Sequence, residues 1–561
     1  MSNKSDHNSL RSDALRRLVS KRLVSDASVS LAILIALAVF SVALPSELVQ
    51  ASAGDRDLTF GHDGKVITDF SGNEAAADVK VQPDGKIVAA GITTIDTVNS
   101  DFALARYNPD GSLDSGFGAG GRVTTDFAGM FDRANALALQ PDGKIIVAGL
   151  SGDRVSTGDF ALARYNVDGT LDPDFGVGGK LVTDFFGGFD SASEMAIQPD
   201  GRILVVGAAR TNSQTDFALA RYNINGSLDL TFGTGGKTTI DLGPIDSASA
   251  VALQPDGRIV VAGSTFSIRT INDFAVVRYE SDGKLDETFG PGGKVITDFS
   301  NTNDLGTAVA IQPDGRIMVA GAADDPNGTA FDFALARYNA DGSLDHRFGS
   351  GGKVTTDFVG GLDAASDVAL QPDGRIVAAG FATFGRIPTG SDFAVARYEV
   401  NGALDRSFGA GGQVMTDIAG GFDSGSALAI QADGRLVVAG GTGLVQTSVD
   451  FALVRYAATG GPDFAISLDP VSAKVARGEK IAVRVNLNRL EGFTGNVTVT
   501  VPDADANGVR LNQDALLIDG STAKFKLKIK ASAPTGRHQL VFIGTRPSGQ
   551  QRSTVLTLDV Q

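Results

Sequence analysis

Short apolar runs, each ended by a turn signal, fill the chain from residue 54 to residue 461. The run ALALQ (136–140) is followed by KIIVAG (144–149), with Pro-Asp-Gly between them. Proline presets the first turn position and Asp-Gly closes a tight turn, so these two runs are predicted to form a β-hairpin. Further strands are predicted at DFALARY (159–165) and KLVTDF (180–185). The unit contains no helical periodicity, which predicts an all-β fold.

This four-strand unit recurs along the chain. Gln-Pro-Asp-Gly starts at residues 82, 140, 198, 254, 312 and 371, and a Gln-Ala-Asp-Gly variant starts at 431, with a spacing of 56 to 60 residues. Solenoid periods are usually shorter and their units carry helices or single strands, whereas four short strands make a propeller blade. The repeats therefore predict a seven-bladed β-propeller over residues 54–461.

The two ends of the repeat region predict how the ring closes. The region opens with KVITDF (65–70), a strand of the fourth type, and stops after FALVRY (451–456), a strand of the third type. The last blade thus lacks an outer strand, and the N-terminal strand can supply it. This pairing would leave no unpaired blade edge inside the ring.

The repeat also resembles a known family. The pattern FALARYNxDGSLDxxFGxGGKVTTDF followed by ALALQPDGKIVVAG is similar to the bacterial delta-sixty repeat, and the resemblance covers about 400 residues. The resemblance implies a β-propeller. Members of that family share no agreed activity, so it leaves the function open.

Residues 462–561 follow a different pattern. Alternating apolar and polar residues predict strands at 464–470, 480–488, 496–502, 523–532, 538–544 and 553–560. Such a series predicts a small antiparallel β-sandwich. The segment resembles the immunoglobulin-like modules of bacterial exoproteins, although it lacks the Cys and Trp of antibody domains. The resemblance implies a spacer or adhesion role.

Residues 1–53 are predicted to be a signal peptide. Six basic residues precede the uncharged run from Val29 to Leu44, which is too short to span a bilayer core as a helix. Ala51-Ser52-Ala53 supplies a signal-peptidase site, so we expect cleavage after Ala53. The alternative is an uncleaved membrane anchor. A twin-arginine route fits Arg16-Arg17 only loosely.

Composition excludes several classes of function. The chain has no cysteine and only four histidines, which excludes disulfides, thiolate metal sites and most histidine-based catalysis. The net charge of −16 disfavours nucleic acid and anionic membrane surfaces as partners.

The candidate binding residues are seven acids, one in each repeat, eight residues before the turn glutamine: Glu74, Asp132, Asp190, Asp246, Asp304, Asp363 and Asp423. If the ALALQ-type strand is innermost, they could ring one mouth of the central channel and bind a cation. Calcium is then the expected ion, because it accepts irregular oxygen coordination. The competing interpretation is that each acid accepts hydrogen bonds from amides two or three residues ahead in its own loop.

Other repeated polar residues are predicted to be architectural. Each third strand and each fourth strand carries an aspartate, such as Asp101 and Asp126, and an arginine precedes each strand tyrosine, as in Arg106. We expect these arginines to pair with these strand aspartates. The turn from Asn108 to Asp114 partly matches a calcium loop but fits ordinary turn chemistry better.

These observations favour a non-enzymatic protein that binds or scaffolds through its propeller loops. No catalytic residue and no firm cofactor can be assigned, and the metal content stays open. We expect a monomer located in the periplasm, at the cell surface or outside the cell, with a protein or glycan partner. Membrane contact is expected only through an uncleaved N-terminal segment. The alternative is a hydrolase or lyase acting on polysaccharide with a propeller active site.

Overall fold

The computed structural model describes residues 53–561, apart from 95–98, 128–130, 154–156, 212–213, 268–270, 326–329, 385–389, 444–448, 458–462, 491–495, 502–503, 506–507, 514 and 546–550. The predicted signal segment lies outside the described residues except for Ala53. In the described part of the chain, no helix is long and apolar enough to cross a membrane.

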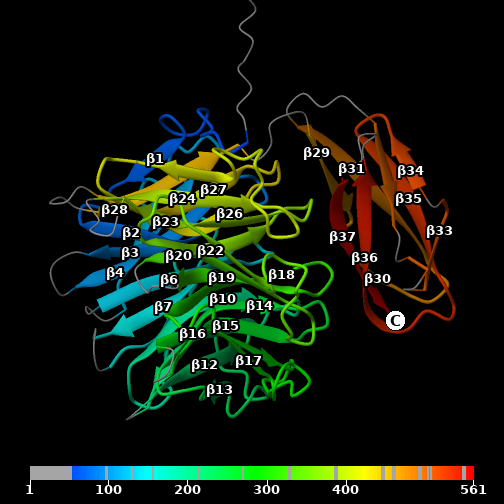
Figure 1. Ribbon diagram of the computed structural model, residues 1–561. Coiled ribbons are helices and arrows are strands. Elements are labelled where there is room, and N and C mark those ends of the chain that lie inside the picture. Colours follow the sequence, from blue (N-terminus) through cyan, green and yellow to red (C-terminus); the bar gives the residue numbers. More distant parts are fainter. Residues whose placement is uncertain are drawn as a thin grey trace, which may run out of the picture. The chain divides into compact units, whose positions relative to one another are not determined.

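The repeat region forms a seven-bladed β-propeller with four strands in each blade (Figure 1). The first three blades contain β2 (Asn73–Val81), β3 (Ile87–Thr94), β4 (Ser100–Tyr107) and β5 (Arg122–Thr125); β6 (Phe131–Leu139), β7 (Ile145–Gly152), β8 (Asp159–Tyr165) and β9 (Lys180–Thr183); and β10 (Asp190–Ile197), β11 (Ile203–Arg210), β12 (Thr215–Tyr222) and β13 (Lys237–Ile240).

The fourth to sixth blades contain β14 (Asp246–Leu253), β15 (Ile259–Ser267), β16 (Ile271–Tyr279) and β17 (Lys294–Thr297); β18 (Asp304–Ile311), β19 (Ile317–Asp324), β20 (Phe331–Tyr338) and β21 (Lys353–Thr356); and β22 (Asp363–Leu370), β23 (Ile376–Thr383), β24 (Ser391–Tyr398) and β25 (Gln413–Thr416). The seventh contains β26 (Phe422–Ile430), β27 (Leu436–Gly443), β28 (Val449–Tyr456) and β1 (Lys65–Thr68).

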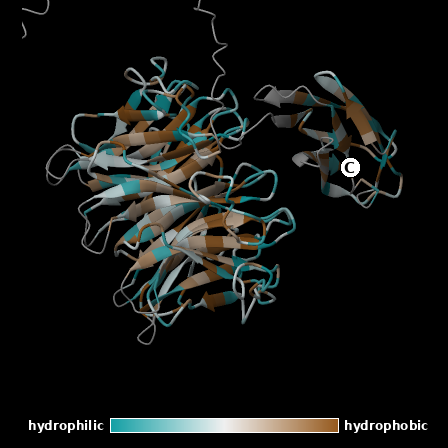
Figure 2. Ribbon diagram, turned by 45° about the horizontal axis from the view of Figure 1, so that its top comes forward, coloured by the Kyte–Doolittle hydropathy of each residue, from teal (hydrophilic) through white to brown (hydrophobic). Residues whose placement is uncertain are grey.

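The first strand of each blade is the innermost. First strands of successive blades contact one another around the ring, and β26 of the seventh blade contacts β2 of the first. The hydrophobic core lies between blades. One cluster, for example, joins Leu204 and Val206 of the third blade to Ile259 and Val261 of the fourth. Figure 2 shows hydrophobic residues concentrated in the strands and hydrophilic ones in the connecting loops.

The predicted closure by the N-terminal strand is confirmed. β1 pairs with β28 in antiparallel register, with Lys65 opposite Val454 and Thr68 opposite Phe451 (Figure 1). The segment before β1 also belongs to the last blade, because Gly54 N donates to Ala457 O at 2.7 Å. Ala53 is buried and its carbonyl accepts from Gly409 N at 2.8 Å, so cleavage after Ala53 would alter this end of the ring.

Each first strand carries a β-bulge at the same place. In the third blade the register with β11 shifts between Ala192 and Glu194, opposite Gly207. A Cβ at Gly207 would lie only 2.0 Å from the carbonyl oxygen of Ser191. A glycine is therefore needed in the second strand of each inner hairpin, because the backbones of the first and second strands approach closely at the bulge.

The C-terminal strands form a β-sandwich, as expected. One sheet has the order β29 (Asp463–Asp469), β31 (Lys480–Leu490), β35 (Thr522–Ile529) and β33 (Val509–Leu511). The other has the order β30 (Ser472–Val475), β37 (Gln551–Val560), β36 (Gly536–Thr545), β32 (Val497–Thr500) and β34 (Ala515–Ile518). Phe525 and Phe542 meet edge to face in the core between the sheets. The sequence did not predict the short strands β30, β33 and β34.

Candidate functional site

The seven candidate acids all lie at the start of an innermost strand, and all seven are fully buried. Because they are buried, they do not line a shared channel mouth. Most accept a backbone amide from the loop before them: Asp304 Oδ2 from Phe299 N at 2.6 Å, and Asp363 Oδ2 from Phe358 N at 2.7 Å. The donors therefore precede the acids, whereas the competing sequence interpretation placed them ahead.

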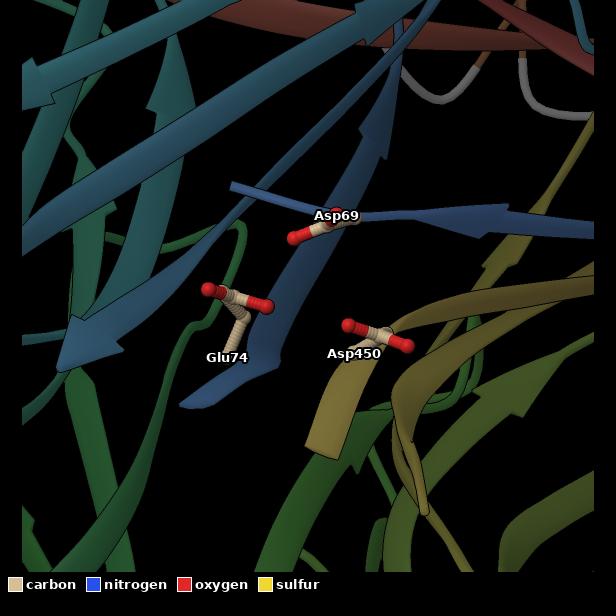
Figure 3. Close-up of side chains that lie close together, drawn as sticks. All are labelled: Asp69, Glu74 and Asp450. Carbon is tan, nitrogen blue, oxygen red and sulfur yellow. The ribbon is translucent and has the colours of Figure 1, made fainter. Parts of the chain in front are cut away.

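Each acid instead meets two acids of the preceding blade. Asp132 of β6 lies with Asp101 of β4 and with Asp126, which directly follows β5, and one ligand oxygen of each lies within 4.8 Å of the others. Figure 3 shows the triad at ring closure, where Glu74 and Asp450 each turn an oxygen toward the space beside Asp69. We call these sets the junction triads: Asp69–Glu74–Asp450, Asp101–Asp126–Asp132, Asp159–Asp184–Asp190, Asp216–Asp241–Asp246 and Asp273–Asp298–Asp304.

The last two junctions follow the same plan. Burial raises the pKa of Asp332 to about 6, and the neighbouring charge of Asp357 adds to the shift. Burial also raises the pKa of Asp392 to about 6, with contributions from Asp417 and Asp423. We therefore count Asp332–Asp357–Asp363 and Asp392–Asp417–Asp423 among the junction triads.

Burial and crowding of like charges favour the protonated form in these triads. Burial is the largest cause that raises the pKa of Asp304 to about 7, and the charges of Asp298 and Asp273 contribute. At the closing junction, burial raises the pKa of Glu74 to about 7, with Asp450 as its carboxyl neighbour.

The triads differ in one hydrogen bond. In the fourth blade, the Thr265 hydroxyl donates to Asp246 Oδ1 at 2.6 Å. The residues at the same register position opposite Asp304 and Asp363 are Ala323 and Ala382, which have no hydroxyl. In the described chain, Asp304 Oδ1 is buried without a hydrogen-bond partner, and Asp363 has only the backbone of Thr383 as a further donor.

The triads also differ in the nearest cation. The first residue of the fourth strand in the next blade reaches back to the loop that carries the middle acid. Lys353 Nζ donates to Asp298 O at 3.0 Å, but at the following junction Gln413 Nε2 donates to Asp357 O at 2.8 Å. The triad Asp332–Asp357–Asp363 thus lacks the cationic side chain that its neighbour has at this position.

The expected pairing of the strand arginines was wrong. Arg106 Nε binds Asp114 Oδ2 at 2.7 Å, and Arg164 binds Asp172 in the same way, so the partner is the turn aspartate eight residues later. The last arginine, Arg455, binds Asp57 at 2.7 Å, which ties the two ends of the ring together. The turn itself is ordinary, because Asp110 Oδ1 accepts from the Ser112 amide at 2.9 Å and hydroxyl at 2.6 Å.

A second charged group breaks the sevenfold repeat. The position just after the bulge holds Asp78, Glu194 and Asp367 in three blades and alanine in the other four. Two residues after Asp78 stands Lys80, where the other blades have alanine. We call these four residues the channel cluster. Lys80 borders a cavity of about 480 Å³ lined by apolar residues of four first strands, including Val81, Leu139 and Ile197.

Two residues of the channel cluster also hold adjacent blades together. Asp78 accepts from the amides of Val79 and Leu137, both at 2.7 Å, and its Oδ1 pairs with Lys80 Nζ at 2.5 Å. Asp367 likewise accepts from Val368 N and from Leu428 N of the next blade, both at 2.7 Å. Both aspartates therefore join adjacent innermost strands.

The electrostatics of the channel cluster centre on Glu194 and Lys80. Burial and the charge of Asp78 raise the pKa of Glu194 to about 8. Burial lowers the pKa of Lys80, but the charges of Asp78, Glu194 and Asp367 outweigh that effect and raise it. Sequence reasoning missed this group, although a column-by-column alignment of the seven repeats would have shown charged residues among alanines.

Comparison with known proteins supports the repeat architecture. Seven segments match the family described as a domain of unknown function (DUF5122) beta-propeller: 82–117, 140–175, 198–232, 254–289, 312–348, 371–408 and 431–463. These matches assign the repeats to a β-propeller repeat family. A search of curated proteins found no significant match.

Solved structures give weaker similarities. The polysaccharide lyase Uly1 is 12% identical, with a TM-score of 0.43, and the match covers 73% of this chain and 98% of the lyase. Domains 4 and 5 of the S-layer protein SbsC are 16% identical, with a TM-score of 0.13 and coverage of 35% and 90%. At such low identity and TM-score, these similarities say nothing about the activity of this chain.

Proposed function

We propose that the protein is a secreted or surface-exposed, non-enzymatic binding or scaffold protein. The propeller loops are the recognition surface, and the C-terminal sandwich is a spacer. The signal-type segment over residues 1–53 and the resemblance to delta-sixty repeats and immunoglobulin-like modules support this proposal. The net charge of −16 disfavours nucleic acid as a partner. The proposed partner is therefore a protein or glycan of the envelope.

One observation carries the proposal: the rigid parts of the blades repeat, whereas the connections between second and third strands differ in length. Residues 268–270 connect β15 to β16, whereas residues 384–390 connect β23 to β24. Variable loops on a rigid scaffold are the usual place for recognition. A catalytic group would have to break the symmetry, because one substrate needs one geometry.

The channel cluster keeps a second candidate open. A hydrolase or lyase acting on polysaccharide would need asymmetric acid and base groups facing the channel, and Glu194 beside Lys80 is such a pair. Two facts favour the binding role. Asp78 and Asp367 are occupied by backbone amides, and the strand tyrosines are buried inside the blades rather than in the channel.

The test compares the intact protein with a variant whose residues 384–390 are replaced by the shorter 268–270 sequence. Both are assayed for binding to purified envelope proteins and to a glycan array, and for turnover of the same glycans. We expect the loop variant to lose binding to a specific component while keeping its melting temperature. Turnover of any glycan that Glu194→Gln abolishes would overturn the binding role in favour of the enzyme.

A further inference from the structure

We propose that the junction triads bind Ca²⁺, and that the triads completed by Asp304 and Asp363 are the principal sites. This inference does not depend on the proposed recognition role. It rests on the three carboxylates that meet at each junction and on buried oxygens without a donor.

The unpartnered oxygens point to a ligand. Asp304 and Asp363 are fully buried, and each uses Oδ2 to accept a loop amide. Asp304 Oδ1 has no hydrogen-bond partner in the described chain, although a buried carboxyl oxygen without a partner is costly, and the backbone of Thr383 is the one donor near Asp363 besides the loop amide. In the Asp304 triad, Oδ1 is the oxygen left for a cation shared with Asp273 and Asp298, since one ligand oxygen of each lies within 4.8 Å of the others.

The surrounding charges rank the sites. Lys353 faces the Asp304 triad and its charge partly neutralises the carboxylates. At the Asp363 triad the corresponding side chain is the neutral amide of Gln413. We therefore infer that the Asp332–Asp357–Asp363 triad binds a cation more tightly than the other triads.

The geometry favours calcium over magnesium. Two oxygens on opposite sides of an ion are separated by at most twice the metal–oxygen distance, which is about 4.6–5.2 Å for Ca²⁺ and about 4.0–4.2 Å for Mg²⁺. Oxygens within 4.8 Å of one another are compatible with either ion, but Ca²⁺ accepts irregular oxygen coordination whereas Mg²⁺ demands near-octahedral geometry. Carboxylate oxygens alone also suit a hard cation, and no His or Cys belongs to these groups.

The experiment measures thermal unfolding of the full chain in chelator, in millimolar CaCl₂ and in millimolar MgCl₂, with calorimetric titration of CaCl₂. Calcium at a hundredfold excess over Kd should raise the melting temperature by about 3–5 °C, and magnesium should raise it less. Equal melting temperatures in calcium and chelator, or an equal shift in magnesium, would overturn the proposal.

Three variants locate the effect. Gln413→Lys places a cation beside the Asp363 triad, and Ala382→Thr supplies the hydroxyl that Thr265 provides elsewhere. Each should raise the melting temperature in chelator and reduce the calcium-induced shift, and calorimetry should detect one site fewer. Glu287→Gln removes an exposed acid and is the matched control, which should keep the full shift. A shift that stays complete in both junction variants would contradict the assignment.

Discussion

The strand tyrosines show how one residue position links two blades. Tyr222 donates to the hydroxyl of Thr183 at 2.9 Å, from the third strand of one blade to the fourth strand of the blade before it. The same bond joins Tyr165 to Thr125 at 2.8 Å. Tyr279 is the exception: its buried hydroxyl has no partner in the described chain, because Ile240 stands at the position of the threonine.

This exception predicts opposite outcomes for one substitution. Tyr222→Phe breaks a buried hydrogen bond and should lower the free energy of unfolding by about 1 kcal/mol. Tyr279→Phe removes an unsatisfied hydroxyl and should leave stability unchanged or slightly higher. Urea unfolding of both variants checks this. Equal losses in the two tyrosine variants would contradict the hydrogen-bond account.

Glu194 predicts a pH dependence in the channel, where Asp78, Lys80 and Asp367 are its charged neighbours. Its pKa is raised from 4.5 to about 8 in the folded protein, so the fold holds a proton that the unfolded chain has released. Its contribution to stability therefore falls as pH rises from about 4.5 to about 8 and is level above that range.

Glu194→Gln removes this titration. Relative to the parent protein, its melting temperature should rise between pH 5 and pH 8.5 by about 3–5 °C. Glu287→Gln, an exposed acid, should show no such trend. If the difference between Glu194→Gln and the parent is the same at both pH values, the raised pKa is not a property of the fold.

At the scale of the strand, turn chemistry made most of the propeller predictable. Pro-Asp-Gly marked six of the inner hairpins and Ala-Asp-Gly the seventh, and the expected third strand at 159–165 is β8 as observed. The fourth strand is shorter than expected, since β9 ends at Thr183 and leaves Asp184 in the loop. This shift brings the middle acid into the junction triad. A single sequence unit does not reveal the bulge, which requires a glycine on the opposing strand.

The bulge predicts a strong effect of a small substitution. Gly207→Ala would place a Cβ 2.0 Å from Ser191 O and 2.9 Å from the Cα of Ala192. Overpacking of this kind should cost about 1–3 kcal/mol or more. Gly520→Ala, which has no atom within 4 Å of the added Cβ, is the control and should be nearly neutral. Urea unfolding distinguishes the two, and a neutral Gly207→Ala would show that the strands separate freely at the bulge.

At the scale of the whole molecule, repetition made the ring predictable and hid its exceptions. The seven acids were found from their spacing, but their partners come from the preceding blade, which no pattern within one repeat shows. The arginines were assigned to the wrong partners for a related reason. Their partner aspartates lie in a turn, where ordinary turn hydrogen bonding already explains an aspartate. Residues that differ between blades, such as Gln413 and Lys80, indicate candidate sites that the shared repeat pattern does not show.

The closed ring is the central claim, because it holds the loops and the junction triads in place. Residues before and within β1 complete the last blade through the β28 pairing, through Asp57 bound to Arg455 at 2.7 Å, and through the buried ring of Phe60. The measurement compares thermal unfolding of the chain lacking residues 1–72 with that of the chain lacking residues 1–52. The longer deletion should lower the melting temperature by about 10 °C or more and cause aggregation through the exposed β28 edge. The same melting temperature and a monodisperse monomer for both chains would contradict closure by the N-terminal strand.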